Sequence, residues 1–450
     1  MLNTNVDSKD MNNGSSSKIK QNKMYVLLLA IVLFVSACQS TSTRNQPLLV
    51  GPVAPETSSK HQQKNVASLQ NANVFLDVAV PVFDPGFPMQ SNGTDIDYEE
   101  MDDEGIWPQL RRTEAKLFAV ETKKSLENTG AFGAVSVVPD ANTSADVFVL
   151  GKILHSDSEV VEMELTVVDA SGEILGIKEF EHEVDESFIK DQRNAGKNPY
   201  QPIFDQGRDY VVALLSRLSD EEKQEIKNVA TVRYARYYNP DEYSQYLSTE
   251  IERKNRQRYY KFSLEGMPAE NDPMLNRIED LRAQELLFVD RLQDQYDTFY
   301  AETNDAYYTW QRETLPEIIA RREAQTERNI KAGLGVGLAI LAGILANKSS
   351  DSSASGSSTR GGAEAAGAVL AGVGSMIAIN DAFQSNSEMK VQSAIIEEKG
   401  QAVDLTLGPT EMKFADQIIE LKGTASEQYM QWKQHLRDMY ELEKTPDVQL

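Results

Sequence analysis

The 450-residue sequence has a single cysteine and only four histidines, which stand far apart at positions 61, 155, 182 and 435. One thiol can form neither an internal disulfide nor a cysteine-rich metal site. The sequence also has no phosphate-binding glycine loop, no HExxH zinc motif and no GxSxG nucleophile motif. We therefore expect a protein that is not an enzyme and that needs no metal or cofactor.

Positive charge is also scarce, because 45 Lys and Arg stand against 69 Asp and Glu, for a net charge of −24. Nucleic-acid affinity depends on Lys and Arg that neutralise phosphates, so the sequence predicts no nucleic-acid partner. Hydrophobic residues make up 40% of the chain, which is ordinary for a folded protein. The length allows about two to three domains.

The amino terminus has the layout of an export signal. Residues 18–38 read KIKQNKMYVLLLAIVLFVSAC, in which three lysines precede an apolar run of 12 residues, 24–35. That run is too short to span a membrane, and small residues follow it. Residues 35–38, VSAC, resemble the bacterial lipobox. The resemblance implies cleavage between Ala37 and Cys38 and a lipid on the Cys38 sulfur. The alternative is a cytosolic protein in which the cysteine falls there by chance.

Lipidation would decide where the protein resides, since several acyl chains on one residue hold a membrane stably. Gln39 follows the cysteine, as in lipoproteins sorted to the outer membrane. Removal of 1–37, which hold four Lys and two Asp, leaves 41 basic and 67 acidic residues, too acidic a body to adhere to anionic lipid by charge. We therefore predict a signal peptide at 1–37, attachment to outer-membrane lipid through acylated Cys38, and a mostly periplasmic chain. Residues 38–71 are interpreted as a lipidated flexible tether with a reach of about 30 Å.

Residues 72–218 predict a small α/β sandwich domain, within a fold of the α+β class. Alternating apolar residues indicate strands at 74–80, 134–138, 146–154, 160–168 and 174–184. Helices are expected at 110–128 and 204–218, the second covering the packed face of the sheet. Residues 95–104 hold seven carboxylates. A calcium loop there would lack the glycine of an EF-hand, so we expect a solvated loop.

Three segments of this domain, LENTGAFGAVSVVP, SADVFVLGKI and MELTVVDASGEIL, resemble the amino-terminal domain of the translocation protein TolB. Related folds occur in the curli-secretion lipoprotein CsgG and in peptidoglycan-synthase activator lipoproteins. The resemblance covers about a third of the chain and involves structural motifs without an active site. It implies a periplasmic docking module with envelope-protein partners.

Residues 219–330 predict a helical stalk. It begins with a capping box at Ser219 and Glu222 and is interrupted only at 266–273. Eleven of the 17 tyrosines lie between Tyr234 and Tyr308, and we expect their hydroxyls at the wet margin of helix packing. Residues that recur every three or four positions form a coiled-coil-like seam. Its members are Val289, Leu292, Tyr296, Phe299, Thr303, Ala306 and Trp310.

Residues 331–380 predict two apolar helices, 332–346 and 363–379, around a polar loop at 347–362. Small residues every four positions leave a flat strip that allows another helix to approach closely, as in a glycine zipper. At 15 and 17 residues, the helices measure about 22–25 Å, short of an average bilayer core, although the outer membrane is thinner. We predict that this hairpin enters the outer membrane as one member of a ring; the alternative is a water-soluble hairpin buried against neighbouring helices. The helix-packing residues are Gly333, Gly335, Gly337, Ala339, Gly343, Ala363, Gly367, Ala371 and Ser375.

Residues 381–450 predict a helix to 399, short strands at 403–407 and 412–421, and a last helix from 424 to 443. Together these patterns predict an outer-membrane lipoprotein that forms homo-oligomers through its helical region and acts in assembly or as part of an export channel. The alternative is a monomeric periplasmic binding or regulatory module with a soluble hairpin.

Overall fold

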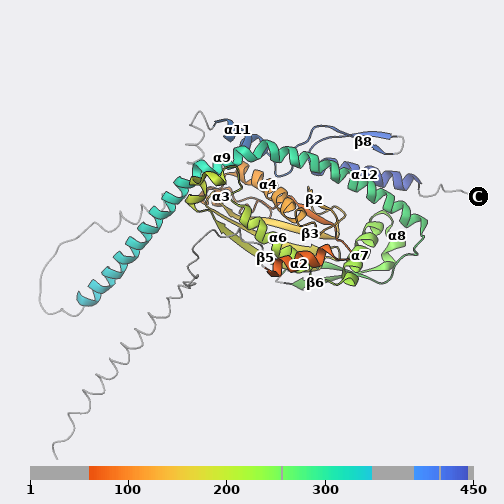
Figure 1. Cartoon of the computed structure of the whole chain (residues 1–450), viewed down its shortest axis with the longest axis horizontal. Helices are drawn as coiled ribbons and strands as arrows, with labels where there is room; N and C mark the ends of the chain where they lie inside the picture. The colour runs from red at the N-terminus through yellow and green to blue at the C-terminus, as the bar shows by residue number, and fades with distance from the viewer. Residues whose placement is uncertain (1–59, 255–256, 347–389, 415–416, 444–450) are drawn as a thin grey trace, which may run out of the picture. The chain divides into compact units, whose positions relative to one another are not determined.

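A five-stranded sheet forms the centre of the computed structural model, which describes residues 60–254, 257–346, 390–414 and 417–443 (Figure 1). The strand order is β2-β1-β3-β4-β5. β1 pairs in parallel with β2 and β3, while β3, β4 and β5 form an antiparallel meander. All five predicted strands are present, and the α+β class is confirmed. The strands are β1 Val78–Pro81, β2 Val135–Val138, β3 Val147–Ser156, β4 Val160–Asp169 and β5 Ile174–Glu183.

Two helices cover one face of the sheet, as the apolar patterns predicted. α4 Pro108–Glu127 provides the crossover that the parallel pair β1 and β2 requires. α6 Gln201–Leu215 packs on β4 and β5. It approaches them so closely that a Cβ at Gly207 would lie 2.8 Å from Leu165 Cδ1. The four residues of β4 predicted to face the core, Val161, Met163, Leu165 and Val167, are all fully buried.

Two segments predicted to be irregular contain helices. α2 Lys60–Gln70 packs on α6 with Leu69 buried, so the predicted tether at 38–71 is wrong for its last part. In the acidic stretch, α3 Tyr98–Asp103 replaces the expected loop. Its N-cap, Asp97, accepts hydrogen bonds from the backbone of Glu99 and Glu100, and acidic residues in a first turn stabilise a helix.

The predicted helical stalk contains a β-hairpin. α7 Asp220–Tyr238 begins at the predicted capping box, with both of its hydrogen bonds present. After α8 Pro240–Tyr243, however, β6 Leu247–Lys254 and β7 Gln257–Leu264 pair antiparallel. The helical interpretation is wrong here. The many Glu, Lys and Arg residues favour a helix, but Leu247 packs on Val229 and Val232 of α7, and this packing holds the segment as a hairpin.

The longest element is α9 Pro273–Ala346, a single helix of 74 residues (Figure 1). At about 1.5 Å per residue it measures about 110 Å. It runs without interruption from the predicted stalk into the first apolar helix of the predicted hairpin. The polar loop and the second apolar helix lie outside the described residues. Of the helices in the described residues, none is both long enough and apolar enough to cross a membrane.

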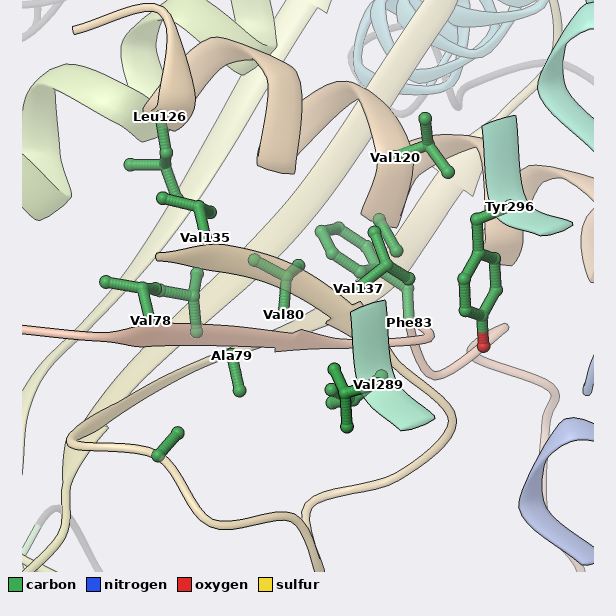
Figure 2. Packing of buried hydrophobic residues seen from close by; sticks show 14 of the residues in the cluster. Val78, Ala79, Val80, Phe83, Val120, Leu126, Val135, Val137, Val289 and Tyr296 are labelled. Atoms are coloured by element: carbon green, nitrogen blue, oxygen red, sulfur yellow. The ribbon is translucent and has the colours of Figure 1, made fainter. Parts of the chain in front are cut away.

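The apolar seam of α9 packs on its own chain. Its seven residues are each at most 3% exposed. Figure 2 shows two of them, Val289 and Tyr296, beside the strand residues of the core. Gln293 also binds both backbone groups of Val137 on the edge strand β2, at 2.9 Å and 2.8 Å, which covers an edge that another strand could otherwise pair with. The coiled-coil-like seam is therefore an intramolecular contact.

The carboxy-terminal segment completes the same core. α11 Lys390–Lys399 and α12 Ala425–Glu443 match the predicted helices, and α12 begins at a Thr424–Glu427 pair with reciprocal hydrogen bonds. The single strand predicted at 412–421 is instead two strands, β8 Thr410–Phe414 and β9 Gln417–Leu421, which pair as a hairpin. The strand predicted at 403–407 is absent from the described structure, apart from one bridge between Thr406 and Thr424. One buried cluster joins residues of the sheet, α9 and α12.

Candidate functional site

The structure describes few of the residues that the sequence singled out. Ala37 and Cys38 lie outside the described residues, as do Ala363, Gly367, Ala371 and Ser375. Gly333, Gly335, Gly337, Ala339 and Gly343 lie on α9, where the backbone alone is described. The predicted lipid attachment and glycine zipper therefore stay predictions.

The most unusual described feature is a buried carboxylate, Glu114 of α4, whose side chain is completely inaccessible. Its Oε1 accepts hydrogen bonds from the hydroxyls of Ser156 on β3, at 2.6 Å, and Tyr307 on α9, at 2.8 Å. Its Oε2 lies 3.2 Å from Arg111 Nε, as an ion pair without hydrogen-bond geometry. Burial raises the pKa of Glu114, and the Arg111 charge and both hydroxyls oppose that rise.

A cavity of about 260 Å³ lies beside Glu114 and is lined by Trp107, Arg111, His155 and Asp157, among others. His155 Nε2 is 3.1 Å from Asp157 Oδ2. The Ser156 hydroxyl is directed to Glu114, so these side chains do not form the serine–histidine pair that nucleophilic catalysis uses. In the part of the chain that is described, no group of three or more His, Cys, Asp or Glu could hold a metal ion.

The turn between β3 and β4 joins this cavity to α9. Asp157 Oδ1 accepts hydrogen bonds from the backbone of Glu159 and Val160, at 3.1 Å and 2.8 Å. Ser158, between them, has φ = 74°, a conformation that costs energy in a non-glycine residue and is maintained by its surroundings. Arg322 of α9 binds Asp157 Oδ2 at 2.5 Å and Glu159 Oε2 at 2.7 Å. Burial acts to raise the pKa of Asp157, but hydrogen bonds and the charges of His155 and Arg322 hold it below its usual value.

Two further glutamates bind tyrosine hydroxyls across element boundaries. Glu121 of α4 accepts from Tyr300 and Tyr308 of α9, at 2.6 Å and 3.1 Å. Glu285 of α9 accepts from Tyr234 of α7 at 2.8 Å and from Tyr429 of α12 at 2.5 Å. Burial raises the pKa of tyrosines such as Tyr307 and Tyr429 well above its usual value, so the phenols stay protonated and can donate. The prediction that the tyrosine hydroxyls lie at a wet margin is wrong for Tyr234 and Tyr307, which are buried, whereas Tyr300 and Tyr308 are half-buried. We call Glu114, Glu121 and Glu285 with their tyrosine donors the tyrosine–glutamate contacts.

α4 also makes polar contacts with the carboxy-terminal segment. Lys116, almost fully buried, donates from Nζ to the Ala402 carbonyl at 2.5 Å and lies 5.4 Å from the centre of the Phe299 ring. Thr113 donates to the Ile396 carbonyl at 3.3 Å. Burial lowers the pKa of Lys116 to about 7. α4 is therefore the element through which the sheet, α9 and the carboxy-terminal segment are connected by polar side chains.

Sequence reasoning missed these glutamates because buried carboxylates are rare. One signal was present in α4, where Glu114 and Glu121 are seven residues apart and therefore lie on one helix face. These groups form a structural junction, in which protonated phenols donate hydrogen bonds to carboxylates, and cations pair with carboxylates, between packed elements.

Comparison of the chain with known protein families, curated proteins and solved structures finds no match.

Proposed function

We propose that this protein is an outer-membrane lipoprotein, held by acylated Cys38, that acts without catalysis as an assembly or export-channel component of the cell envelope. In this proposal the folded unit faces the periplasm and holds a glycine-rich hairpin, 331–380, that packs against copies of itself.

The observation that carries the proposal is the continuity of α9. Its first part lies in the core, while residues 332–346, which belong to the same uninterrupted helix, have the small-residue pattern of a helix-packing strip. Pro316, within α9, removes one backbone hydrogen bond, but the helix continues through it and connects the core to the glycine-rich segment. The folded unit would therefore set the direction in which the glycine-rich segment is presented.

The tyrosine–glutamate contacts support a rigid mounting for that helix. A hydrogen bond contributes about 0.5–1.5 kcal/mol net to the stability of a fold, and more where one partner is charged. Tyr300, Tyr307 and Tyr308 all extend from α9 to glutamates of α4, and Arg322 adds ion pairs near the last described side chains of α9. Such a helix suits a part that must hold its position against neighbouring subunits.

The alternative, a monomeric periplasmic binding or regulatory module, is favoured by one observation. The seam from Val289 to Trp310, which resembled a coiled-coil contact, is occupied within the chain. Under the alternative, the hairpin stays in water and no copy-to-copy contact is needed.

Lipid attachment is tested on the full chain produced in a Gram-negative host. Mass spectrometry of the wild-type product should find Cys38 as the acylated first residue, with 1–37 removed. Cys38→Ser should keep its leader and take up no labelled palmitate, because the hydroxyl cannot accept the lipid. Ser40→Ala, two residues away, is the matched control and should be processed as wild type. A wild-type product with a free thiol and an intact leader would refute the proposal.

Assembly is tested by the mass of the detergent-solubilised complex. A ring of many protomers supports the assembly function, whereas a monomer supports the alternative. Replacing Gly335, Ala339 and Gly343 together by Leu should abolish the ring without affecting lipidation, since bulk on the strip keeps helices apart. Leu334→Phe combined with Leu345→Phe adds bulk on the helix face away from both rows of small residues and should leave the ring intact. Rings of normal mass from the triple-leucine variant would contradict the zipper.

A further inference from the structure

A second cavity, of about 500 Å³, lies where α7, β7, α12 and the segment before β3 meet. We call it the α7–α12 pocket. Its volume falls within the ~300–1,000 Å³ typical of small-molecule sites. The lining residues that matter here are three cations, Arg233, Arg236 and Lys433, and three aromatic side chains, Phe148, Tyr237 and Phe262.

The charge of this pocket is opposite to that of the protein. The chain has 69 acidic residues against 45 basic ones, yet none of the residues that line the pocket is a carboxylate. Within the described parts of the chain, no carboxylate oxygen comes within 4.0 Å of the charged nitrogens of Arg233, Arg236 or Lys433. Such a concentration of one sign favours counter-ions of the other sign.

Each cation is held by a neutral partner. Arg233 donates from Nη1 to the Ala170 carbonyl, Arg236 donates to Thr249 Oγ1 at 3.1 Å, and Lys433 donates to the Asn142 carbonyl at 2.8 Å. Lys433 is only 8% exposed. Buried charges are usually paired, so Lys433, which is buried without an ionic partner beside two half-buried arginines, leaves room for an anion from outside the chain.

Two carboxylates, those of Asp169 and Glu285, lie near the pocket. Asp169 attracts Arg233 without reaching ion-pair distance, and burial lowers the pKa of that arginine. Glu285 accepts hydrogen bonds from the Tyr234 hydroxyl and, at 3.3 Å, from the Ser144 backbone; Tyr234 and Ser144 both line the pocket. Glu285 therefore holds two walls in place, and its oxygens are already bound by donors. Three cations against these two carboxylates leave a net positive charge.

The aromatic side chains add a flat apolar surface beside the cations. The Arg233 guanidinium lies 4.0 Å from the centre of the Phe262 ring, and Lys433 Nζ lies 4.6 Å from that of Tyr237. A ligand with a planar group can stack on such rings, while its charged group reaches the cations.

We propose that the α7–α12 pocket binds a small organic anion, with its carboxylate or phosphate held by Arg233, Arg236 and Lys433 and a planar apolar group against the aromatic side chains. The pocket lies on the folded unit and its occupation does not depend on lipidation or on the hairpin.

The test is isothermal titration calorimetry of the full chain in detergent at low salt, with phenyl phosphate as the probe. We expect a dissociation constant of about 1 mM or tighter that weakens as salt is added. Benzylamine, of similar shape and opposite charge, should not bind, and inorganic phosphate should bind more weakly than phenyl phosphate.

Substitutions assign the binding to the pocket. Arg236→Gln should weaken phenyl phosphate binding about tenfold or more, the loss expected when a hydrogen bond to a charged group is removed. Arg236→Lys keeps the charge and should retain part of the affinity. Arg312→Gln, an exposed arginine of α9, is the matched control and should bind as wild type.

Several results would overturn the proposal. These are the absence of binding to wild type at about 10 mM phenyl phosphate, far above the expected dissociation constant; equal binding of benzylamine; and undiminished affinity in Arg236→Gln. Equal affinity for inorganic and phenyl phosphate would refute the role of the rings. The ligand comparison uses wild type alone, so it decides the matter even if Arg236→Gln does not fold.

Discussion

Lys116 and Glu114 stand two residues apart on α4, and each carries an ionisable group that the fold has removed from water. The apolar periodicity of α4 correctly predicted a helix at this place. It could not identify the buried charges, because their partners, Tyr307 and the Ala402 carbonyl, come from segments almost 200 and almost 300 residues away. A pattern within one helix contains no information on such distant partners.

Lys116 should make stability depend on pH. Its pKa is about 7 in the folded protein and about 10.5 when unfolded, so between these values the unfolded chain binds more protons. Stability that depends on this group should therefore rise as the pH increases from 7 to 10 and fall as the pH decreases toward 7. Lys116→Met fills similar volume without a charge and should gain stability relative to wild type as the pH is lowered.

Urea unfolding at several pH values measures this difference in free energy. Lys123→Met is the matched control on the same helix. Its amino group pairs with the exposed carboxylate of Glu127, so we expect a difference from wild type that changes little with pH. A pH-independent difference for Lys116→Met would contradict the lowered pKa.

At the scale of elements, alternation and capping signals located most of the fold. The five strands, α4, α6, α7 and α12 follow from local patterns of apolar residues and from capping signals, although β1 and α4 are buried on more than one face. The β6–β7 hairpin escaped prediction because its strands carry charged residues on both sides of a few apolar ones, Leu247 and Phe262 among them. Its structure is decided by the surface of α7, which local sequence does not reveal.

The Arg322 ion pairs should limit fluctuations of α9 beyond the core. We expect Arg322→Gln to speed hydrogen–deuterium exchange of amides at 319–324, since the helix loses its attachment to Asp157 and Glu159. The free energy of unfolding should change by only about 0–1 kcal/mol, because the arginine side chain is 40% exposed. Arg312→Gln should leave exchange at 319–324 unchanged. Unaltered exchange in Arg322→Gln would show that the ion pairs do not hold the helix.

On the scale of the whole molecule, the predicted segments 72–218, 219–330 and 381–450 contribute to one buried cluster. The sequence composition suggested that these segments are separate structural parts. No local signal indicates that Tyr429 and Trp432 of α12 pack with α9. Trp432 is fully buried, and its Nε1 donates to the Gln284 carbonyl at 3.1 Å.

Trp432→Ala should therefore destabilise the entire folded unit, by about 3–5 kcal/mol. Far-UV circular dichroism and the fluorescence of the remaining tryptophans, Trp107 and Trp310, should report one lowered midpoint on heating. Met430→Ala, at an exposed position of the same helix, should unfold as wild type does. If only the dichroism of the helices changed while Trp107 kept its wild-type midpoint, the sheet and α12 would be independent.

The position of α12 in the core has a consequence for biogenesis. Domains that are self-sufficient can fold while the rest of the chain is still being synthesised. Here Tyr429 and Trp432 of α12, which pack beside Phe288 and Gln284 of α9, are translated more than 100 residues after them. The earlier part of the polypeptide should consequently emerge from the ribosome without a stable tertiary structure, and a chaperone that shields apolar surface would find its binding sites open until translation has passed Tyr440.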